Sequence, residues 1–495
     1  MAWNYFELAP GGSSAPTGGV AAVSRIPTSM ELWHAGADGS VQGAFWYEGA
    51  TWQRYELAPA GSASLTGGIT AVSRIPTSME LWWMGPNGSV QGAFWYDGAA
   101  WQRYELAPAG SASPTGGIAA ASRAPGTIEV WWVAADGSVQ GAFWYDGAAW
   151  QRYELAPAGS ASLTGGVAAV SRVPNSMELW WMGGNGSVQG ASWYEGATWQ
   201  RYELAPASSA SPTGGITAVA RIPTSMELWW MGPNGSVQGA FWYDGAAWQR
   251  YELAPAGSAS PTGGVAVASR VGGTIEVWWI APDGSVQGAF WYEGATWQRY
   301  ELSPLAGAST AGGIAAVSRV PGSLEVWWKG GNRSVRDAYW YPGGYAVEHS
   351  NIVHIHDNVT FRAGVAVGGW FDLALTRLGD ISFSGHFNDS GLDSYDMSLV
   401  VVLMTPNGLA YSVTHEGRTY GALEPGSADD NWVVNTHSDF VAANWDQQFV
   451  SSVWRWNAYA GSRLEGAVAD MVAGLAKQLA EALGKAAVAA VVALI

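Results

Sequence analysis

Hydrophobic and polar positions repeat along most of the chain with a period of 49 residues. The phase is marked by an arginine that closes the segment AVSR or a close variant of it. These arginines are Arg25, Arg74, Arg123, Arg172, Arg221, Arg270 and Arg319. No insertion or deletion interrupts the seven copies. Self-similarity at a period of this length is typical of repeat architectures in which each copy is one structural unit.

One copy contains four short apolar segments separated by turn residues. In the second copy these are Gly68–Arg74, Met79–Met84, Ser89–Tyr96 and Trp101–Leu106. Gly, Pro, Asn and Asp between them favour turns, so each copy predicts four short strands. Four strands in about 40–50 residues are typical of propeller blades. Small residues at Gly67 and Gly68 suit the crowded centre of a ring, and the bulky residues from Trp101 onward suit its rim.

The seventh copy lacks the last of its four segments. It runs through Trp340 and Tyr341, but Ala346 stands where tryptophan is due. The missing segment lies at the start of the chain, in the run WNYFELAP at residues 3–10. We therefore predict an all-β, closed seven-bladed β-propeller over residues 1–345, with an N-terminal strand that closes the last blade.

The 49-residue period ends near residue 345, and a different pattern follows. Residues 358–456 alternate between apolar and polar positions and contain turn residues, which predicts a smaller β-rich domain of unknown function over residues 346–461. The run SLVVVLM at 398–404 is expected to be its buried central strand. From 462 to 495, leucine, valine and methionine recur every three or four residues, which predicts an amphipathic C-terminal helix.

This helix has two interpretations. It docks on the β-rich domain or on a partner subunit, giving a homo-oligomer, or it is a membrane-active or targeting tail. Its last ten residues, 486–495, carry no charge but are too few to span a bilayer. The helix is also not basic, which argues against binding to a membrane surface.

Composition removes several classes of function. The chain has no cysteine, which excludes disulfides and thiolate metal sites. Its net charge of −17 argues against a nucleic-acid partner. No signal peptide and no transmembrane segment is recognised, so we expect either a cytoplasmic protein or export without a cleaved signal. No cofactor-binding fingerprint is found.

Tryptophan is the most informative residue type, because 27 of the 32 tryptophans lie in the repeats. Most are expected to fill the interfaces between blades, since an indole buries a large area. Some are expected to stack on the apolar face of a sugar ring, with the arginine and glutamate of the same copy bonding to hydroxyl groups. An alternative for the Arg74 and Glu80 pair is that the two charges simply neutralise each other across one hairpin.

The run ELWWMGPNGSVQGAFWYDGAAWQRYELAPAGSASPTGGITAVSRIP resembles the repeat of the seven-bladed propeller lectins of the Photorhabdus PLL type. This resemblance covers all seven copies and implies binding of L-fucose and O-methylated sugars in pockets between adjacent blades. By this analogy the arginine, the glutamate and one tryptophan of a copy are candidate sugar-binding residues. They are Arg25, Glu31 and Trp33; Arg74, Glu80 and Trp83; Arg123, Glu129 and Trp132; Arg172, Glu178 and Trp181; Arg221, Glu227 and Trp230; and Arg270, Glu276 and Trp279.

The copies are not identical, so we expect four to six working sites rather than seven. The first copy has Trp33 and His34 in place of the tryptophan pair, and the seventh has Arg333, Arg336 and Asp337 in place of Gly, Gln and Gly. No histidine recurs with the repeat, and so no catalytic base recurs with it. We therefore expect a multivalent lectin rather than an enzyme in residues 1–345.

Six of the seven histidines lie in the C-terminal third. His354 and His356 lie on one face of a strand and are candidate ligands for one half of a metal site. His386, Asp389 and Asp396 are candidates for the other half, although their spacing fixes no third or fourth ligand. The alternative is that all of them are structural. No nucleophile elbow, zinc-protease or phosphate-loop motif is present. The sequence leaves two roles open for this third: an accessory or effector domain, or a toxin or enzyme targeted by the glycan-binding propeller. A propeller that binds proteins rather than sugars is a further alternative.

Overall fold

The computed structural model describes residues 3–340 except 272, 305, 306 and 321, and then residues 352–361, 365–376, 379–404, 410–422, 424–443, 445, 453–461, 467–482 and 491–493. The chain divides into two compact units. Unit 1 contains residues 1–319 and 323–344, and unit 2 contains residues 345–495 together with 320–322.

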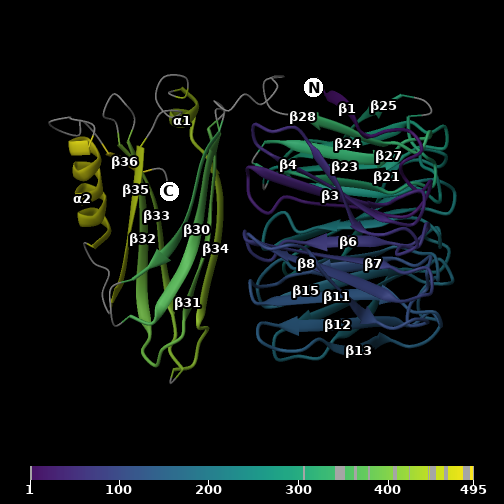
Figure 1. The fold of residues 1–495 in the computed structure, drawn as a ribbon, viewed down its shortest axis with the longest axis horizontal. Helices are drawn as coiled ribbons and strands as arrows, with labels where there is room; N and C mark the ends of the chain where they lie inside the picture. The colour runs from purple at the N-terminus through teal and green to yellow at the C-terminus, as the bar shows by residue number, and fades with distance from the viewer. Residues whose placement is uncertain are drawn as a thin grey trace. The chain divides into compact units, whose positions relative to one another are not determined.

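Unit 1 contains, in its described residues, seven antiparallel sheets of four strands each (Figure 1). Sheet 1 has β2 (Val20–Val23), β3 (Ser29–Ala35), β4 (Val41–Tyr47) and β5 (Gln53–Ala58). Sheet 2 has β6 (Ile69–Val72), β7 (Ser78–Met84), β8 (Val90–Tyr96) and β9 (Gln102–Ala107). Sheet 3 has β10 (Ile118–Ala121), β11 (Thr127–Val133), β12 (Val139–Tyr145) and β13 (Gln151–Ala156). Sheet 4 has β14 (Val167–Val170), β15 (Ser176–Met182), β16 (Val188–Tyr194) and β17 (Gln200–Ala205).

The remaining sheets follow the same order. Sheet 5 has β18 (Ile216–Val219), β19 (Ser225–Met231), β20 (Val237–Tyr243) and β21 (Gln249–Ala254). Sheet 6 has β22 (Val265–Ala268), β23 (Thr274–Ile280), β24 (Val286–Tyr292) and β25 (Gln298–Ser303). Sheet 7 has β26 (Ile314–Val317), β27 (Leu324–Lys329), β28 (Val335–Trp340) and β1 (Asn4–Ala9). The prediction of an all-β chain with four short strands in each repeat is thus confirmed.

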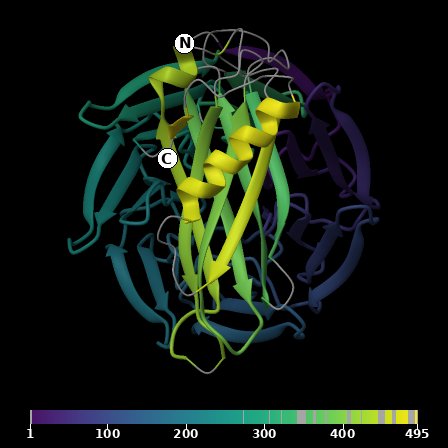
Figure 2. The same ribbon diagram turned by 90° about the vertical axis from the view of Figure 1, so that its left-hand side faces the viewer.

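The first strands of the seven sheets are joined in a ring by backbone hydrogen bonds. Figure 2 shows the sheets of unit 1 arranged in a circle. In each, the second of two adjacent glycines donates its backbone N–H to the first glycine of the next sheet. The bonds are Gly19 to Gly67, Gly68 to Gly116, Gly117 to Gly165, Gly166 to Gly214, Gly215 to Gly263, Gly264 to Gly312 and Gly313 to Gly18. The last bond returns to the first sheet, so the arrangement is that of a β-propeller in which each sheet is one blade.

Strand β1 joins the two ends of unit 1. It pairs antiparallel with β28, with Asn4 opposite Tyr339 and Phe6 opposite Asp337. The N-terminal strand therefore completes the blade that lacks its own fourth strand, as the sequence predicts. Pairing also removes the exposed edge that β28 would otherwise present.

The glycine pairs are required by close backbone approach. A Cβ atom on Gly67 would lie 2.7 Å from Pro114 O, and one on Gly68 would lie 3.0 Å from Ile118 N. Both neighbours are backbone atoms of the next blade, which do not move aside as a flexible side chain does. Glycine here sets the spacing of the inner strands.

Tryptophan pairs fill the interfaces between blades. Trp82 and Trp83 point to opposite faces of β7, because successive side chains of a strand alternate. Trp83 packs with Trp33 of blade 1, and Trp82 packs with Trp132 of blade 3. The space over Gly92 of β8 is occupied by the ring of Tyr104 in the same blade.

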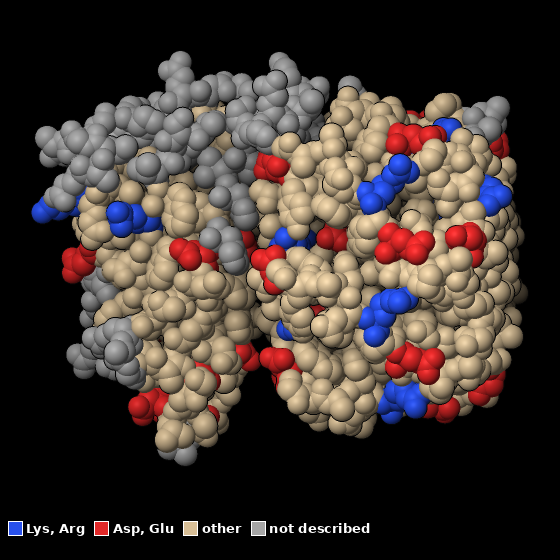
Figure 3. All heavy atoms as spheres, in the orientation of Figure 1, with Lys and Arg blue, Asp and Glu red and all other residues tan. Residues whose placement is uncertain are grey.

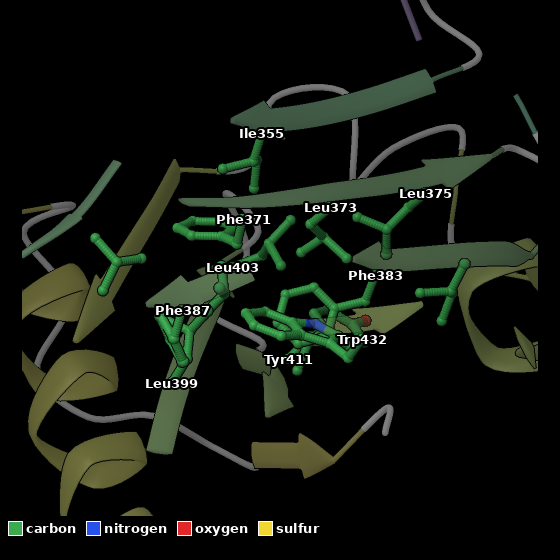
Figure 4. Close-up of a cluster of buried hydrophobic side chains, with 14 of the residues drawn as sticks. Ile355, Phe371, Leu373, Leu375, Phe383, Phe387, Leu399, Leu403, Tyr411 and Trp432 are labelled. Carbon is green, nitrogen blue, oxygen red and sulfur yellow. The ribbon is translucent and has the colours of Figure 1, made fainter. Parts of the chain in front are cut away.

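Unit 2 contains two four-stranded sheets and two helices in its described residues. One sheet has the order β29 (Ile352–Thr360), β30 (Val367–Thr376), β31 (Asp380–Asp389), β34 (Asp429–His437). The other has the order β35 (Val453–Gly461), β32 (Tyr395–Met404), β33 (Ala410–Thr419), β36 (Val491–Ala493). Side chains of both sheets form one core, which includes Phe371, Phe383, Leu399 and Trp432 (Figure 4). Strand β32 is buried and central, as predicted for residues 398–404.

The helices are α1 (Asp439–Ala443) and α2 (Ala467–Ala482). The apolar face of α2, with Leu475 and Leu479, packs on Val400 and Val402 of β32. The helix therefore docks on its own β-rich domain. The prediction of one helix over 462–495 is wrong at its end, because residues 491–493 form β36 and pair parallel with β33. β-Branched valines at 491 and 492 favour this strand. Neither described helix is long and apolar enough to cross a membrane.

Two glycine substitutions should shift the stability of the two units in opposite directions. Gly92→Ala places a Cβ 2.5 Å from the Tyr104 ring, and we expect it to lower the free energy of unfolding of unit 1 by about 1–3 kcal/mol. Gly474→Ala in α2 has no atom within 4 Å of the new Cβ, so helix propensity should raise the stability of unit 2 by up to about 1 kcal/mol. Calorimetry of the full chain measures both; a stabilising Gly92→Ala would contradict the packing described.

Candidate functional site

An arginine near the start of the second strand of a blade binds groups from two adjacent blades. In blade 2, Arg74 Nε donates to Glu80 Oε1 at 3.1 Å, and Nη2 donates to Tyr96 OH at 2.7 Å. Its Nη1 donates to Pro125 O of blade 3 at 2.6 Å. The guanidinium carbon lies 5.0 Å from the ring centre of Trp144, also in blade 3. We call this group of five residues, with its equivalents in other blades, the arginine cluster.

The contact between arginine and tryptophan is made at every junction of the ring. The pairs are Arg25 with Trp95, Arg74 with Trp144, Arg123 with Trp193, Arg172 with Trp242, Arg221 with Trp291, Arg270 with Trp340 and Arg319 with Trp46, at 4.8–5.2 Å. The last pair joins the seventh blade to the first. Each cluster therefore belongs to two blades, and contributes a cation–π contact to their interface.

The charged pair inside the cluster is closed to solvent. Side chains of Arg74 and Glu80 are only 5% and 4% exposed. Burial raises the pKa of Glu80 to about 7, and the neighbouring Arg74 charge offsets this only in part. The glutamates at the same position behave alike: burial raises the pKa of Glu31, Glu129 and Glu276 to about 7, that of Glu178 to about 8, and that of Glu227 in the same direction.

Open pockets lie at the other end of the same interfaces. Strand β7 runs from Ser78, beside the arginine cluster, to Met84, beside the turn that leads into β8, so the two ends are well separated. Pockets at the second end are seen in blades 1, 3 and 4, with volumes of 560, 510 and 520 Å³. Volumes of this size are usual for small-molecule sites. We call them the inter-blade pockets.

The lining of an inter-blade pocket is mostly polar. In blade 3 it includes Gln140 from β12, with Arg152, Tyr153 and Glu154 from β13, and Ser111 from the connection before β10. Arg152 and Glu154 are exposed. On the face of unit 1 that Figure 3 shows, basic and acidic side chains alternate. The pocket thus offers amide, carboxylate, guanidinium and hydroxyl groups within one small cavity.

Repeated hydrogen bonds hold the lining in place. The side-chain amide of a glutamine in the third strand of the blade donates two hydrogen bonds. One goes to the serine two residues before it, and the other goes to a glutamate in the fourth strand. In blade 4, Gln189 donates to Ser187 at 2.9 Å and to Glu203 at 3.1 Å. The same two bonds are made by Gln42, Gln91, Gln140, Gln238 and Gln287. Six blades therefore present nearly the same polar wall.

The structure brings together only two of the three residue types predicted to form one site. Arginine and glutamate of one copy form ion pairs in blades 2, 5 and 6, at 3.1, 3.0 and 3.4 Å, whereas the glutamates of blades 1 and 3 accept from a tyrosine. The second tryptophan of the pair lies instead at the pocket end, where Trp132 and Trp181 line pockets. Their indoles are 2% exposed, so they offer an edge rather than a stacking face. Trp83, Trp230 and Trp279 are equally buried. Trp33 has the first position of its pair and donates to Tyr55 OH.

Sequence reasoning missed the residues that complete both places. The tryptophan beside each arginine comes from the third strand of the next copy, and the pocket residues Gln140, Arg152 and Glu154 were not selected. The available signal was their recurrence: this glutamine is present in six copies and is Arg336 in the seventh. In the seventh blade Arg336 lies opposite Glu7 of β1, so the wall there carries a cation in place of an amide.

The histidines of unit 2 are bonded to different partners. His386 Nδ1 lies 2.9 Å from Asn431, and His415 Nε2 lies 2.8 Å from Asp430. Asp389 accepts from Thr419, while Asp396 pairs with Arg418, so neither completes a site with His386. The side chains of His354 and His356 lie outside the described residues; their backbones are in β29. Within the described residues no group of three or more potential ligands is placed to hold a metal ion.

No family model matches the chain, and no curated protein matches it. Its structure is similar to that of BP39L lectin from Burkholderia pseudomallei, with a TM-score of 0.61 and 18% identity, covering 68% of this chain and 98% of that one. SapL1 lectin in complex with alpha methyl fucoside gives a TM-score of 0.45 and 21% identity, covering 58% and 97%. A variant of Aleuria aurantia lectin in complex with Fucα1-6GlcNAc gives 0.44 and 16%, covering 60% and 98%. The first likeness shows a shared fold.

The buried glutamates make stability depend on pH. The pKa of Glu80 is about 7 in the folded chain against an ordinary value of 4.5, so its protonated form stabilises the fold below about pH 4.5. This stabilisation is lost as the pH rises through about 7. Glutamine at this position stays uncharged at every pH. The melting temperature of Glu80→Gln, relative to that of the unchanged chain, should therefore rise between about pH 5 and about pH 8. A relative melting temperature that falls over this range would show that attraction by Arg74 outweighs burial.

Proposed function

We propose that unit 1 is a multivalent lectin, built as a seven-bladed β-propeller, which binds fucose or O-methylated sugars in its inter-blade pockets. The observation that carries this proposal is the recurrence of an open, polar cavity of 510–560 Å³ at the same place in several blades. The likeness to solved lectins is in keeping with it.

The chemistry of the pocket suits a sugar. A monosaccharide presents a girdle of hydroxyl groups, each of which donates and accepts hydrogen bonds. Gln140 and Glu154 offer acceptor oxygens, Arg152 offers donors, and all three are held near one another on neighbouring strands. The edge of Trp132 and the ring of Tyr153 supply apolar surface beside them.

The arginine clusters are the second location to be tested for the same function, because the resemblance selects their Arg and Glu. Each also contains a half-buried tryptophan. In the structure, however, the guanidinium of Arg74 already binds Glu80, Tyr96 and Pro125 and covers one face of Trp144. A sugar entering here has to displace these bonds, whereas the inter-blade pocket is open.

The repetition of the site in several blades increases the avidity for glycans. A single shallow sugar site binds weakly, because little area is buried and hydroxyl groups have to lose water. Several equal sites on one rigid ring raise the avidity for a glycan-dense surface by about 10²–10⁴. We propose that unit 2 is an accessory or effector domain of this lectin; the alternative, a toxin or enzyme targeted by the propeller, stays a prediction, as does a homo-oligomer.

Removing the polar wall in two pockets should lower the number of bound sugars by two. We propose a variant with Arg152→Ala and Glu154→Ala in blade 3, and Arg201→Ala and Glu203→Ala in blade 4. All four side chains are exposed, so folding should be little affected. Isothermal titration of the full chain with methyl α-L-fucoside, and with an O-methylated fucoside, measures the stoichiometry.

The matched control changes the arginine clusters of the same two junctions. Arg74→Lys and Arg123→Lys keep the charge and remove the planar fork that binds Pro125 and Pro174. If these changes lower the stoichiometry and the pocket changes do not, the sugar sites are the arginine clusters. If the unchanged chain binds no sugar in titration or on a glycan array, the lectin proposal is wrong.

A further inference from the structure

The pocket of blade 1 differs from its counterparts at one buried position. His34 lines it, at the place where the other blades have the second tryptophan of the pair. Those tryptophans each donate their indole N–H to a backbone carbonyl of the preceding connection, at 3.0–3.2 Å. They are Trp83, Trp132, Trp181, Trp230, Trp279 and Trp328. Since the N–H is already bonded, only indole carbons remain to face a ligand in those pockets.

The hydrogen bond of His34 fixes which ring nitrogen carries the proton. Nδ1 lies 3.1 Å from Ala35 O, and a carbonyl oxygen only accepts, so Nδ1 donates. Burial, with the Lys329 charge nearby, lowers the pKa of His34 to about 4, and the ring is neutral near pH 7. Nε2 then carries a lone pair. Among the described residues it has no hydrogen-bond partner.

The imidazole also changes the shape of the cavity. It is smaller than an indole, and the pocket of blade 1 has the largest of the three volumes, 560 Å³. The lining extends to Leu8 and Ala9 of the closing strand β1. His34 itself is only 5% exposed, so its free nitrogen is a fixed group in the wall rather than a surface side chain.

We propose that this pocket is a separate subsite, which selects a sugar that keeps a free hydroxyl group opposite His34 Nε2. The other pockets present indole carbon at this point and accept a methyl or methoxy group there. This subsite rests on the proposed function. An O–H group donates a hydrogen bond to the lone pair of Nε2, whereas an O-methyl group leaves that lone pair without a partner. One ring would thus carry two specificities.

The experiment observes this pocket alone within the full chain. Histidine labelled with ¹⁵N gives a ring signal for His34 that is assigned by its loss in His34→Trp. We expect methyl α-L-fucoside to shift this signal saturably, and its fully O-methylated counterpart to bind this pocket at least about 5-fold more weakly. In His34→Trp, titration calorimetry should show one more site for the O-methylated sugar than in the unchanged chain.

Two further measurements separate the possible failures. His34→Gln keeps a side-chain acceptor and should keep the preference for the free hydroxyl, whether or not His34→Trp folds. If calorimetry detects sugar binding but the His34 signal does not move, or moves equally with both sugars, the subsite is wrong and the lectin proposal stands. If neither sugar gives a binding signal with the full chain, both proposals are wrong.

Discussion

Closure of the ring is the constraint on which the rest of unit 1 depends. Seven backbone hydrogen bonds between glycine pairs fix the distance between neighbouring inner strands, and β1 completes the blade that contains β26. Since the ring has to close with equal steps, every interface must have nearly the same thickness. Tryptophan pairs at the same place in most copies meet this requirement, because they fill a constant volume at native packing density.

This filling decides where chemistry can take place. The middle of an interface is filled by buried side chains such as Trp82 and Trp131, and the arginine cluster and the open pocket lie at its two ends. At one end the arginine cluster is buried and ties adjacent blades together. At the other end the short turn before Gln140 leaves room, and an open pocket remains. The arginine cluster and the inter-blade pocket thus lie at opposite ends of one interface.

The sequence allowed much of unit 1 to be predicted. The 49-residue period predicts the strands, the phase of its ends predicts the pairing of β1, and the spacing of Arg74 and Glu80 predicts their contact. It did not predict which tryptophan lies beside Arg74. Trp82 and Trp83 alternate by strand geometry alone, but the partner of Arg74 is Trp144 in the next copy, and that contact depends on how two blades face each other. In unit 2, β36 was missed because its pairing with β33 is a long-range contact.

The position of β1 has a consequence for how the protein is made. Within unit 1 it is synthesised first, and its partner β28 is the last strand of this unit to be synthesised. The chain between the two strands is nearly as long as the unit itself, and closing so long a loop has an entropic cost. This cost is offset once the other blades have formed and bring β1 and β28 close together. Until then the nascent chain is an open array with unpaired strand edges, which are sites for association with other chains. The ring can therefore close only after residues 1–340 have been synthesised.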